Sequence, residues 1–355
     1  MEKLVIFQPC DGDFFQHGFE RINILVYLSH ENNSNNSNNF KQLTGSLPTA
    51  PYIANSFQNW RRKYKNLLNN LPAFNFQRGF VDAQVTHISI KDFSSDTAVL
   101  RDYLNHWLDS EIFIPTKNDL AQALQLTPQD EVSFVIQTSG VSSPETKNIL
   151  HRLPWHWWNI FPNYYKIEFS ISLNEFRPGF INYENTLSNH NTRLRRVRVL
   201  GIFGNTNSSQ YIKDIDIQTD QKIIKDLRSK GASPRFLHQP KRSEFTALWH
   251  DAIDIFCFSG HSNSEEDCST GWLYINSQEE GLEIKELKNA LRTASDKGLQ
   301  LVIFNSCDGL GLAQAISDLD IPQIIVWREP VPDKVAQQFL FYFLESFASD
   351  NSLYQ

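Results

Sequence analysis

Two residues with the chemistry of nucleophilic catalysis each follow an apolar, strand-like run in the second half of the sequence. The run at residues 253–258 is followed by His261, and the run at residues 301–304 is followed by Cys307. A thiol is an effective nucleophile once a neighbour lowers its pKa or accepts its proton, and an imidazole can do either. The sequence therefore predicts a thiol–imidazole pair, provided that the two strands lie side by side.

The second half alternates strand-like and helix-like segments, the pattern of a parallel sheet covered by helices. Apolar runs predict strands at residues 197–203, 234–237, 253–258, 301–304 and 324–327. Helical spacing predicts helices at residues 220–230, 243–249, 284–294, 310–319 and 332–347. Several of the strands are apolar on both faces, as central parallel strands are. We expect an open, mostly parallel α/β sheet with helices on both faces and functional groups beyond the carboxyl ends of its strands.

This architecture would bring His261 and Cys307 together. A helix at residues 284–294 would connect their strands as a crossover, and neighbouring strands lie about 5 Å apart and end at the same edge. The helix at residues 310–319 starts just after Cys307, so its N-terminal N–H groups would favour a thiolate and later an oxyanion. Gly260 would allow a sharp turn before the histidine.

Structural roles compete with this interpretation. A cysteine at a strand end is ordinarily a small buried hydrophobe, and Cys257 in particular should point into a packed face. A zinc site built from Cys257, His261, Cys268 and Cys307 would need spacings unlike any usual ligand pair, so we expect no metal. A nucleotide-binding loop at residues 201–205 would lack its third glycine and its acidic partner, so we expect no cofactor.

The first half also mixes strands and helices and predicts a second α/β domain. Apolar runs predict strands at residues 4–8, 22–28, 132–137 and 167–171, and helical spacing predicts helices at residues 53–68 and 96–108. Asp96 is the expected N-cap of the second helix. A block with three tryptophans at residues 155–158 is more typical of a packing anchor than of a ligand platform. A polar stretch at residues 183–191 predicts a boundary, with domains at 1–182 and 197–355 and a linker at 183–196.

Composition limits the classes of partner. With 355 residues the chain is long enough for about two domains. Forty acidic residues against 33 basic ones give a net charge of −7, which disfavours nucleic acid as a partner. No run approaches the roughly 18 apolar residues of a membrane span, and no signal peptide is seen. Four irregularly spaced cysteines do not form a disulfide framework, so we expect a reducing cytoplasm.

Several motifs together resemble a known family. Phe258-Ser259-Gly260-His261 and Asn305-Ser306-Cys307-Asp308-Gly309, each after an apolar strand, resemble the CHAT family of caspase-like, separase-related cysteine peptidases. The resemblance extends to Gly271-Trp272-Leu273 and to residues 327–333. Arg152-Leu153-Pro154-Trp155 is similar to cyanobacterial CHAT proteins, some of which carry a membrane-attached CHASE2 sensor downstream.

The resemblance implies roles for individual residues. His261 would be the general base and acid, and Cys307 the nucleophile that forms a thioester with a peptide carbonyl. The backbone N–H groups of Cys307 and Ser262 would form the oxyanion hole. The family usually has glycine where this sequence has Ser262, and a positive φ at a serine would cost about 1 kcal/mol or more. Asp308, Glu265, Glu266 and Asp267 flank the site and would suit a basic substrate side chain, but residues 265–267 also fit a solvated loop, and the sequence does not fix the cleavage preference.

The resulting hypothesis is a cytoplasmic cysteine endopeptidase that cleaves a protein or peptide substrate in a signalling or stress response. The alternative is a catalytically silent caspase-like scaffold that binds a partner protein, with the first half as a degenerate second copy. Family members continue beyond the equivalent of residues 352–355 with a helix and a closing strand. We therefore expect a truncated chain, the soluble part of a longer, membrane-attached protein with a regulatory domain.

Overall fold

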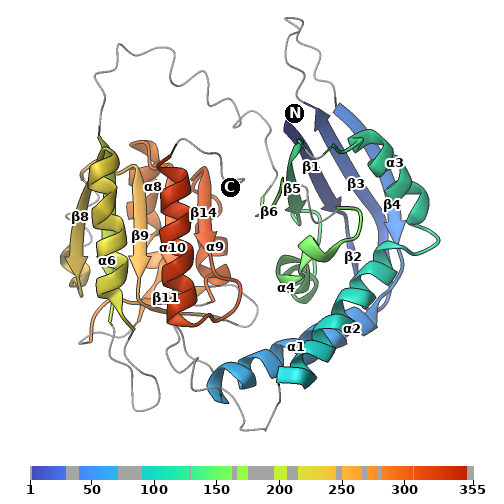
Figure 1. Cartoon of the computed structure of the whole chain (residues 1–355), viewed down its shortest axis with the longest axis horizontal. Helices are drawn as coiled ribbons and strands as arrows, with labels where there is room; N and C mark the ends of the chain where they lie inside the picture. The colour runs from blue at the N-terminus through green and yellow to red at the C-terminus, as the bar shows by residue number, and fades with distance from the viewer. Residues whose placement is uncertain are drawn as a thin grey trace, which may run out of the picture. The chain divides into compact units, whose positions relative to one another are not determined.

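The protein is described by a computed structural model in which two compact units are distinguished. The first unit holds the described residues of 2–64 and 90–174, and the second holds residues 65–70 and the described residues of 196–349 (Figure 1). The structure describes residues 2–28, 40–70, 90–127, 129–161, 166–174, 196–205, 215–244, 250–265, 270–277, 281–306 and 308–349. Each unit is considered separately below.

A five-stranded parallel sheet forms the centre of the second unit, in the order β14-β13-β9-β7-β8 (Figure 1). All four neighbouring pairs are parallel. The strands are β7 (Val197–Phe203), β8 (Ala232–His238), β9 (Ile255–Ser259), β13 (Leu301–Asn305) and β14 (Gln323–Val326). Every residue of β9 and β13 is buried, as expected for inner strands that are apolar on both faces.

Helices cover both faces of this sheet. They are α6 (Ile217–Asp226) and α10 (Asp333–Phe347) on one face, and α8 (Ile284–Asp296) and α9 (Leu310–Ala315) on the other. Successive side chains of a strand point to opposite faces, so Cys257 packs in the core under α6 and α10 while Phe258 packs under α8 and α9. The predicted α/β class and the buried position of Cys257 are confirmed.

The chain between β9 and β13 differs from the sequence-based expectation. No strand was predicted between residues 258 and 301, but three short antiparallel strands, β10 (His261–Ser264), β11 (Gly271–Tyr274) and β12 (Leu282–Glu283), form a separate small sheet. Leu273 of β11 is fully buried in the core under α8 and α9. Leu282 of β12 is buried in the same core, and these two leucines anchor short strands with many polar or small residues, whose apolar pattern is too brief to predict from the sequence.

Two helices of the second unit, α9 and α6, begin or end at other residues than the sequence predicted. The helix expected over residues 310–319 ends as α9 at Ala315. The helix expected from residue 220 begins at Ile217, because the carboxylate of Asp216 accepts hydrogen bonds from the N–H groups of Gln218 and Thr219. Most of the segment expected as a helix at residues 243–249 lies outside the described residues.

The first unit contains a mixed sheet in the order β4-β3-β1-β5-β6, with β2 also paired to β3. Its strands are β1 (Glu2–Pro9), β2 (Gly12–Asp13), β3 (Gly18–Leu28), β4 (Phe40–Leu47), β5 (Glu131–Gln137) and β6 (Lys166–Ser172). β1, β5 and β6 are parallel, whereas β3 runs antiparallel to β1 and β4. β1 and β3 are therefore an antiparallel pair, whereas β7 and β8, the first two strands of the second unit, are parallel.

Aromatic packing holds the first unit together. Trp155 and Trp158 are buried, and their rings contact Phe7 at centroid distances of 5.4 and 6.1 Å. The two tryptophans are packing anchors, as the sequence predicted, and their partners Phe7 and Phe134 lie in the sheet. Aromatic pairs of this geometry stabilise the folded state beyond the contribution of apolar burial alone.

Four helices of the first unit are α1 (Pro51–Asn70), α2 (Ile90–Leu108), α3 (Ile114–Leu124) and α4 (Pro144–Arg152). The prediction that Asp96 caps α2 is wrong, because the helix already begins at Ile90. The Asp96 carboxylate instead forms an ion pair with Lys63 on α1, at 2.5 Å. In the described part of the chain, we find no helix with the length and apolar character needed to cross a membrane.

Candidate active site

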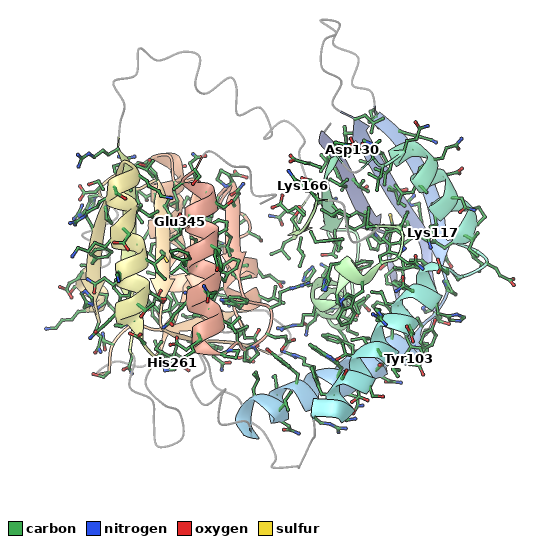
Figure 2. The ribbon with its side chains drawn as sticks, in the orientation of Figure 1. Tyr103, Lys117, Asp130, Lys166, His261 and Glu345 are labelled. Atoms are coloured by element: carbon green, nitrogen blue, oxygen red, sulfur yellow. The ribbon has the colours of Figure 1, made fainter. Side chains whose placement is uncertain are left out.

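β9 and β13 are parallel neighbours, and Ser259 lies opposite Asn305 at their carboxyl ends. His261 follows Ser259 by two residues, and Cys307 follows Asn305 by two residues. The expected adjacency of the two strands is therefore present. Cys307 itself lies outside the described residues. The arrow of β9 in Figure 1 points to the carboxyl end of the parallel strands. Figure 2 shows His261 at this end of the second unit.

His261 is the first residue of β10 and has only 1% of its surface exposed. In the antiparallel ladder it lies opposite Tyr274 of β11. Burial raises the pKa of Tyr274, so its hydroxyl is neutral at physiological pH. The imidazole is thus held by a strand on a packed surface rather than by a free loop.

Ser264 connects the histidine strand to the segment that follows Cys307. Its hydroxyl donates a hydrogen bond to the carbonyl of Asp308 and accepts one from the N–H of Gly311 at 3.1 Å. A Cβ atom at Gly311 would lie 2.1 Å from the carbonyl oxygen of Thr270, so only glycine permits this approach of α9 to the hairpin. β10 and the start of α9 are therefore fixed against each other.

The backbone turns sharply directly after Cys307. Asp308 has φ = +51°, in the left-handed region that few residues other than glycine, asparagine and aspartate adopt. The N–H of Gly309 then donates to the carbonyl of Trp327 at 2.8 Å. A Cβ at Gly309 would lie 2.8 Å from that of Val326. Unusual backbone geometry held by its surroundings is common at functional sites.

Ser262 does not carry the backbone strain considered from the sequence. Among the described non-glycine residues, φ is positive only at Gln125, Gln239, Asp308 and Asp320. The N–H of Glu265 donates to the carbonyl of Thr270, and hydrogen-bonded and non-hydrogen-bonded pairs alternate along an antiparallel ladder. Ser262 opposite Leu273 is therefore a non-hydrogen-bonded pair, and its N–H points away from β11.

The acidic residues expected near the site are only partly described. Glu265 is exposed and follows Ser264 directly, while Asp308 is half-buried and its carbonyl is bound by the same Ser264. Glu265 and Asp308 thus belong to the same edge of the unit. Asp267 and Glu266 lie outside the described residues.

The zinc site considered from the sequence would involve Cys257, His261, Cys268 and Cys307. Within the described ranges, no three His, Cys, Asp or Glu side chains are grouped closely enough to hold a metal ion. Cys257 is buried in the core under α6 and α10. Cys268 and Cys307, the other thiols of the zinc alternative, lie outside those ranges.

Sequence reasoning missed several residues that shape this edge of the sheet. Ser264, Trp327 and Asp220 had no assigned role, although Trp327 stood in a motif. One signal was available for Asp220, because it lies between Ile217 and Ile224 at helical spacing and therefore on the buried face of α6. No pattern indicates Ser264, whose role depends on a contact across 44 residues.

Replacing Ser264 with alanine should lower the free energy of unfolding by about 1–3 kcal/mol, because the carbonyl of Asp308 and the N–H of Gly311 lose their partner. Urea denaturation of the full chain measures the effect. Ser317→Ala is the matched control, because the Ser317 hydroxyl donates to the carbonyl of Gln314, three residues earlier in the chain. Equal losses in Ser264→Ala and the control would contradict the linking role.

The fold and the arrangement described above define a parallel α/β domain with a candidate thiol–imidazole site at its carboxyl edge. Residues 180–355 match the family model of the CHAT domain, and this match supports a CHAT domain over the second half of the chain. CHAT domains are associated with caspase-like peptidase function.

Other comparisons add little. None of the curated proteins matches the chain significantly. Five solved chains match. A non-polymerising MamK mutant bound to AMPPNP is similar at 10% identity, over 97% of this chain and 99% of its own, with a TM-score of 0.17. A similarity of this size says nothing about the fold or function of this chain.

Proposed function

We propose that the second unit is a cysteine endopeptidase that uses His261 and Cys307 as a catalytic dyad. The observation that carries this proposal is the register of β9 and β13, in which Ser259 lies opposite Asn305. Both candidate residues follow these paired positions by the same number of residues. The link from Ser264 to Asp308 and Gly311 adds a second, independent connection between the two segments.

In the proposed reaction, the sulfur of Cys307 attacks the carbonyl carbon of a peptide bond while the imidazole of His261 accepts the thiol proton. The tetrahedral intermediate collapses to a thioester, and the imidazolium gives its proton to the leaving amine. His261 then accepts a proton from water as the water attacks the thioester. The carboxylic acid product leaves, and the proton returns to the thiolate of Cys307.

The oxyanion would be held by the backbone N–H groups of Ser262 and Cys307. The alternation of the β10–β11 ladder directs the N–H of Ser262 away from β11, which is compatible with donation to a substrate oxygen. Cys307 precedes α9 in the sequence, and its own backbone N–H would be the second donor, because the N–H groups of Gly309 and Gly311 already donate to Trp327 and Ser264. Loss of an oxyanion-hole donor typically costs about 10²–10³-fold in turnover.

The substrate is proposed to be a protein or peptide with a basic residue at the cleavage site. Glu265 and Asp308 lie at this edge, Asp267 follows Glu265 by two residues in the sequence, and carboxylates pair best with Arg or Lys. The first unit would be an accessory domain, with the proposed boundary at residues 183–196. The cytoplasmic location, a regulatory partner and a role in signalling belong to the same proposal.

A silent scaffold is the second candidate. Serine in place of the family's glycine at position 262 favours it, because the substitution changes the presumed oxyanion hole. Retention of both His261 and Cys307 favours the enzyme. A scaffold would bind a partner protein through the same edge of the sheet and would leave the thiol of Cys307 with ordinary reactivity.

The test is a peptidyl acyloxymethyl ketone with lysine next to the ketone, which a catalytic thiolate converts to a thioether with release of a carboxylate. We expect the intact chain to react at Cys307, identified by mass spectrometry, at least tenfold faster than at the half-buried Cys10. Denatured protein should show no preference between the two thiols. Equal labelling of both in the folded chain would support the scaffold instead.

A further inference from the structure

Trp327 contacts both ends of the short segment that contains Cys307. Its indole N–H donates to the side-chain oxygen of Asn305 at 3.1 Å, and its carbonyl accepts from the N–H of Gly309 at 2.8 Å. Asn305 ends β13, and Gly309 precedes α9. One residue at the end of β14 therefore fixes the distance between the entry and the exit of this segment.

Asn305 is held on its other side by α6. Its side-chain nitrogen donates to the carboxylate of Asp220 at 3.3 Å, and both residues are at most 1% exposed. An indole N–H can only donate, so it must face the oxygen of the Asn305 amide. The amide of Asn305 therefore has one orientation, with its oxygen toward Trp327 and its nitrogen toward Asp220. Buried polar groups fixed in this way have little freedom to rearrange.

Trp327 is itself positioned by α10. Its ring contacts Phe339 at a centroid distance of 5.0 Å with an edge-to-face geometry, and it packs against Val331 and Ala336. The ring packed in this way directs its N–H toward Asn305. The chain of contacts thus runs from α10 through Trp327 to the end of β13.

We propose that Trp327 and Asn305 are positioning residues that hold the Cys307 segment in its reactive geometry, with Asp220 fixing the orientation of the Asn305 amide. The proposal rests on the proposed function of Cys307. Neither side chain is assigned a contact with substrate, and both would act by keeping the thiol in place relative to His261. A displacement of about 1 Å is enough to lower an enzymatic rate by 10²-fold.

The first test compares Trp327→Phe with Trp60→Phe. Phenylalanine keeps most of the ring packing and removes only the indole N–H. Trp60 is the matched control, because it also donates a hydrogen bond from a half-buried indole, to Thr97 at 3.0 Å, and lies in the first unit. We expect Trp327→Phe to lower kinact for the acyloxymethyl ketone about tenfold with KI within twofold, and Trp60→Phe to change neither.

The second test reverses the polarity of the Asn305–Asp220 pair. Asn305→Asp keeps an acceptor for Trp327 but places two carboxylates together, so kinact should fall at least tenfold. Adding Asp220→Asn restores one donor and one acceptor, so the double variant should recover most of the lost rate. Equal kinact in Trp327→Phe and wild type, or no recovery in the double variant, would overturn the positioning role.

Iodoacetamide alkylation of Cys307 at pH 7 separates this inference from the proposed function. If His261→Ala alkylates as fast as wild type, the dyad itself is absent and the proposed function fails. If alkylation depends on His261 but not on Trp327 or Asn305, the dyad stands and the positioning role is wrong. A rate that depends on all three residues supports both.

Discussion

Replacing Cys307 with alanine should abolish peptide cleavage, with kcat/KM lower than in wild type by at least ~10³-fold. Alanine removes the only sulfur that the proposed mechanism uses, so no thioester can form. Cleavage is measured on a peptide library with the products identified by mass spectrometry. Cys10→Ala is the matched control, because Cys10 is a half-buried thiol of the first unit, and it should retain full activity.

His261→Ala should give a loss of similar size, because the nucleophile and its base act as a unit and their effects are not additive. His261 is buried, so His261→Asn is included as a variant that keeps a polar side chain at the site. His250→Ala, at an exposed position, serves as the control. Thermal unfolding of every variant checks the fold. Cleavage that survives in a folded Cys307→Ala or His261→Asn protein would exclude the dyad.

Replacing Lys3 with methionine should lower the free energy of unfolding of the first unit by about 3 kcal/mol. The Lys3 ammonium is buried and donates to the carboxylate of Asp130 at 2.7 Å and to the carbonyl of Leu124, at the end of α3, at 2.6 Å. The N–H and the hydroxyl of Thr127 donate to the same carboxylate oxygen. Methionine keeps the volume of the side chain but leaves a buried carboxylate without its cation.

The comparison variant is Lys166→Met. Lys166 forms an ion pair with Glu131 at 2.9 Å, but its side chain is 52% exposed, and exposed pairs contribute about 0–1 kcal/mol (Figure 2 labels Lys166 and Asp130). Urea denaturation of the full chain, followed by fluorescence of the first unit's tryptophans, measures both variants. Equal losses in Lys3→Met and Lys166→Met would show that burial does not set the contribution of the pair.

The contribution of Asp130 should depend on pH. Burial raises the pKa of the Asp130 carboxyl, but the hydrogen bonds from Lys3 and Thr127 together lower this pKa by a larger amount. The pKa of Asp130 therefore lies well below its usual range. Because the folded pKa is depressed, the stabilisation is complete above the ordinary pKa near 3.9 and is lost as the pH falls below it. The difference between wild type and Lys3→Met should therefore be constant from about pH 5 to 8 and shrink toward pH 3.

Much of the fold of the second unit could be predicted from its sequence. Continuous apolar runs such as residues 301–304 identify strands covered on both faces, and the connecting helix α8 is strongly amphipathic. A parallel pair joined by one helix places both strand ends at the same edge. These properties depend on local composition and spacing, so they can be predicted from one amino-acid sequence.

The small sheet beside His261 could not be predicted in the same way. β10 and β11 contain mostly polar or small residues, and their position depends on Leu273 reaching the core and on Gly311 admitting the backbone of Thr270. The beginning of α2 was also misplaced, since Asp96 pairs with Lys63 instead of capping the helix. In each case a contact distant in sequence outweighs a local preference.

The sequence by itself determined that the second unit is a parallel α/β domain and that His261 and Cys307 follow neighbouring strands. Hydrophobic periodicity and the order of strands and helices do not depend on distant contacts, so the domain class and the two strand ends could be predicted from the sequence. Only the tertiary structure decided that Ser264, Trp327 and Asp220 form hydrogen bonds with residues on either side of position 307. Their hydrogen bonds join residues 22 to 85 positions apart, and the free energy of such bonds depends on burial and distance, which a linear pattern does not encode.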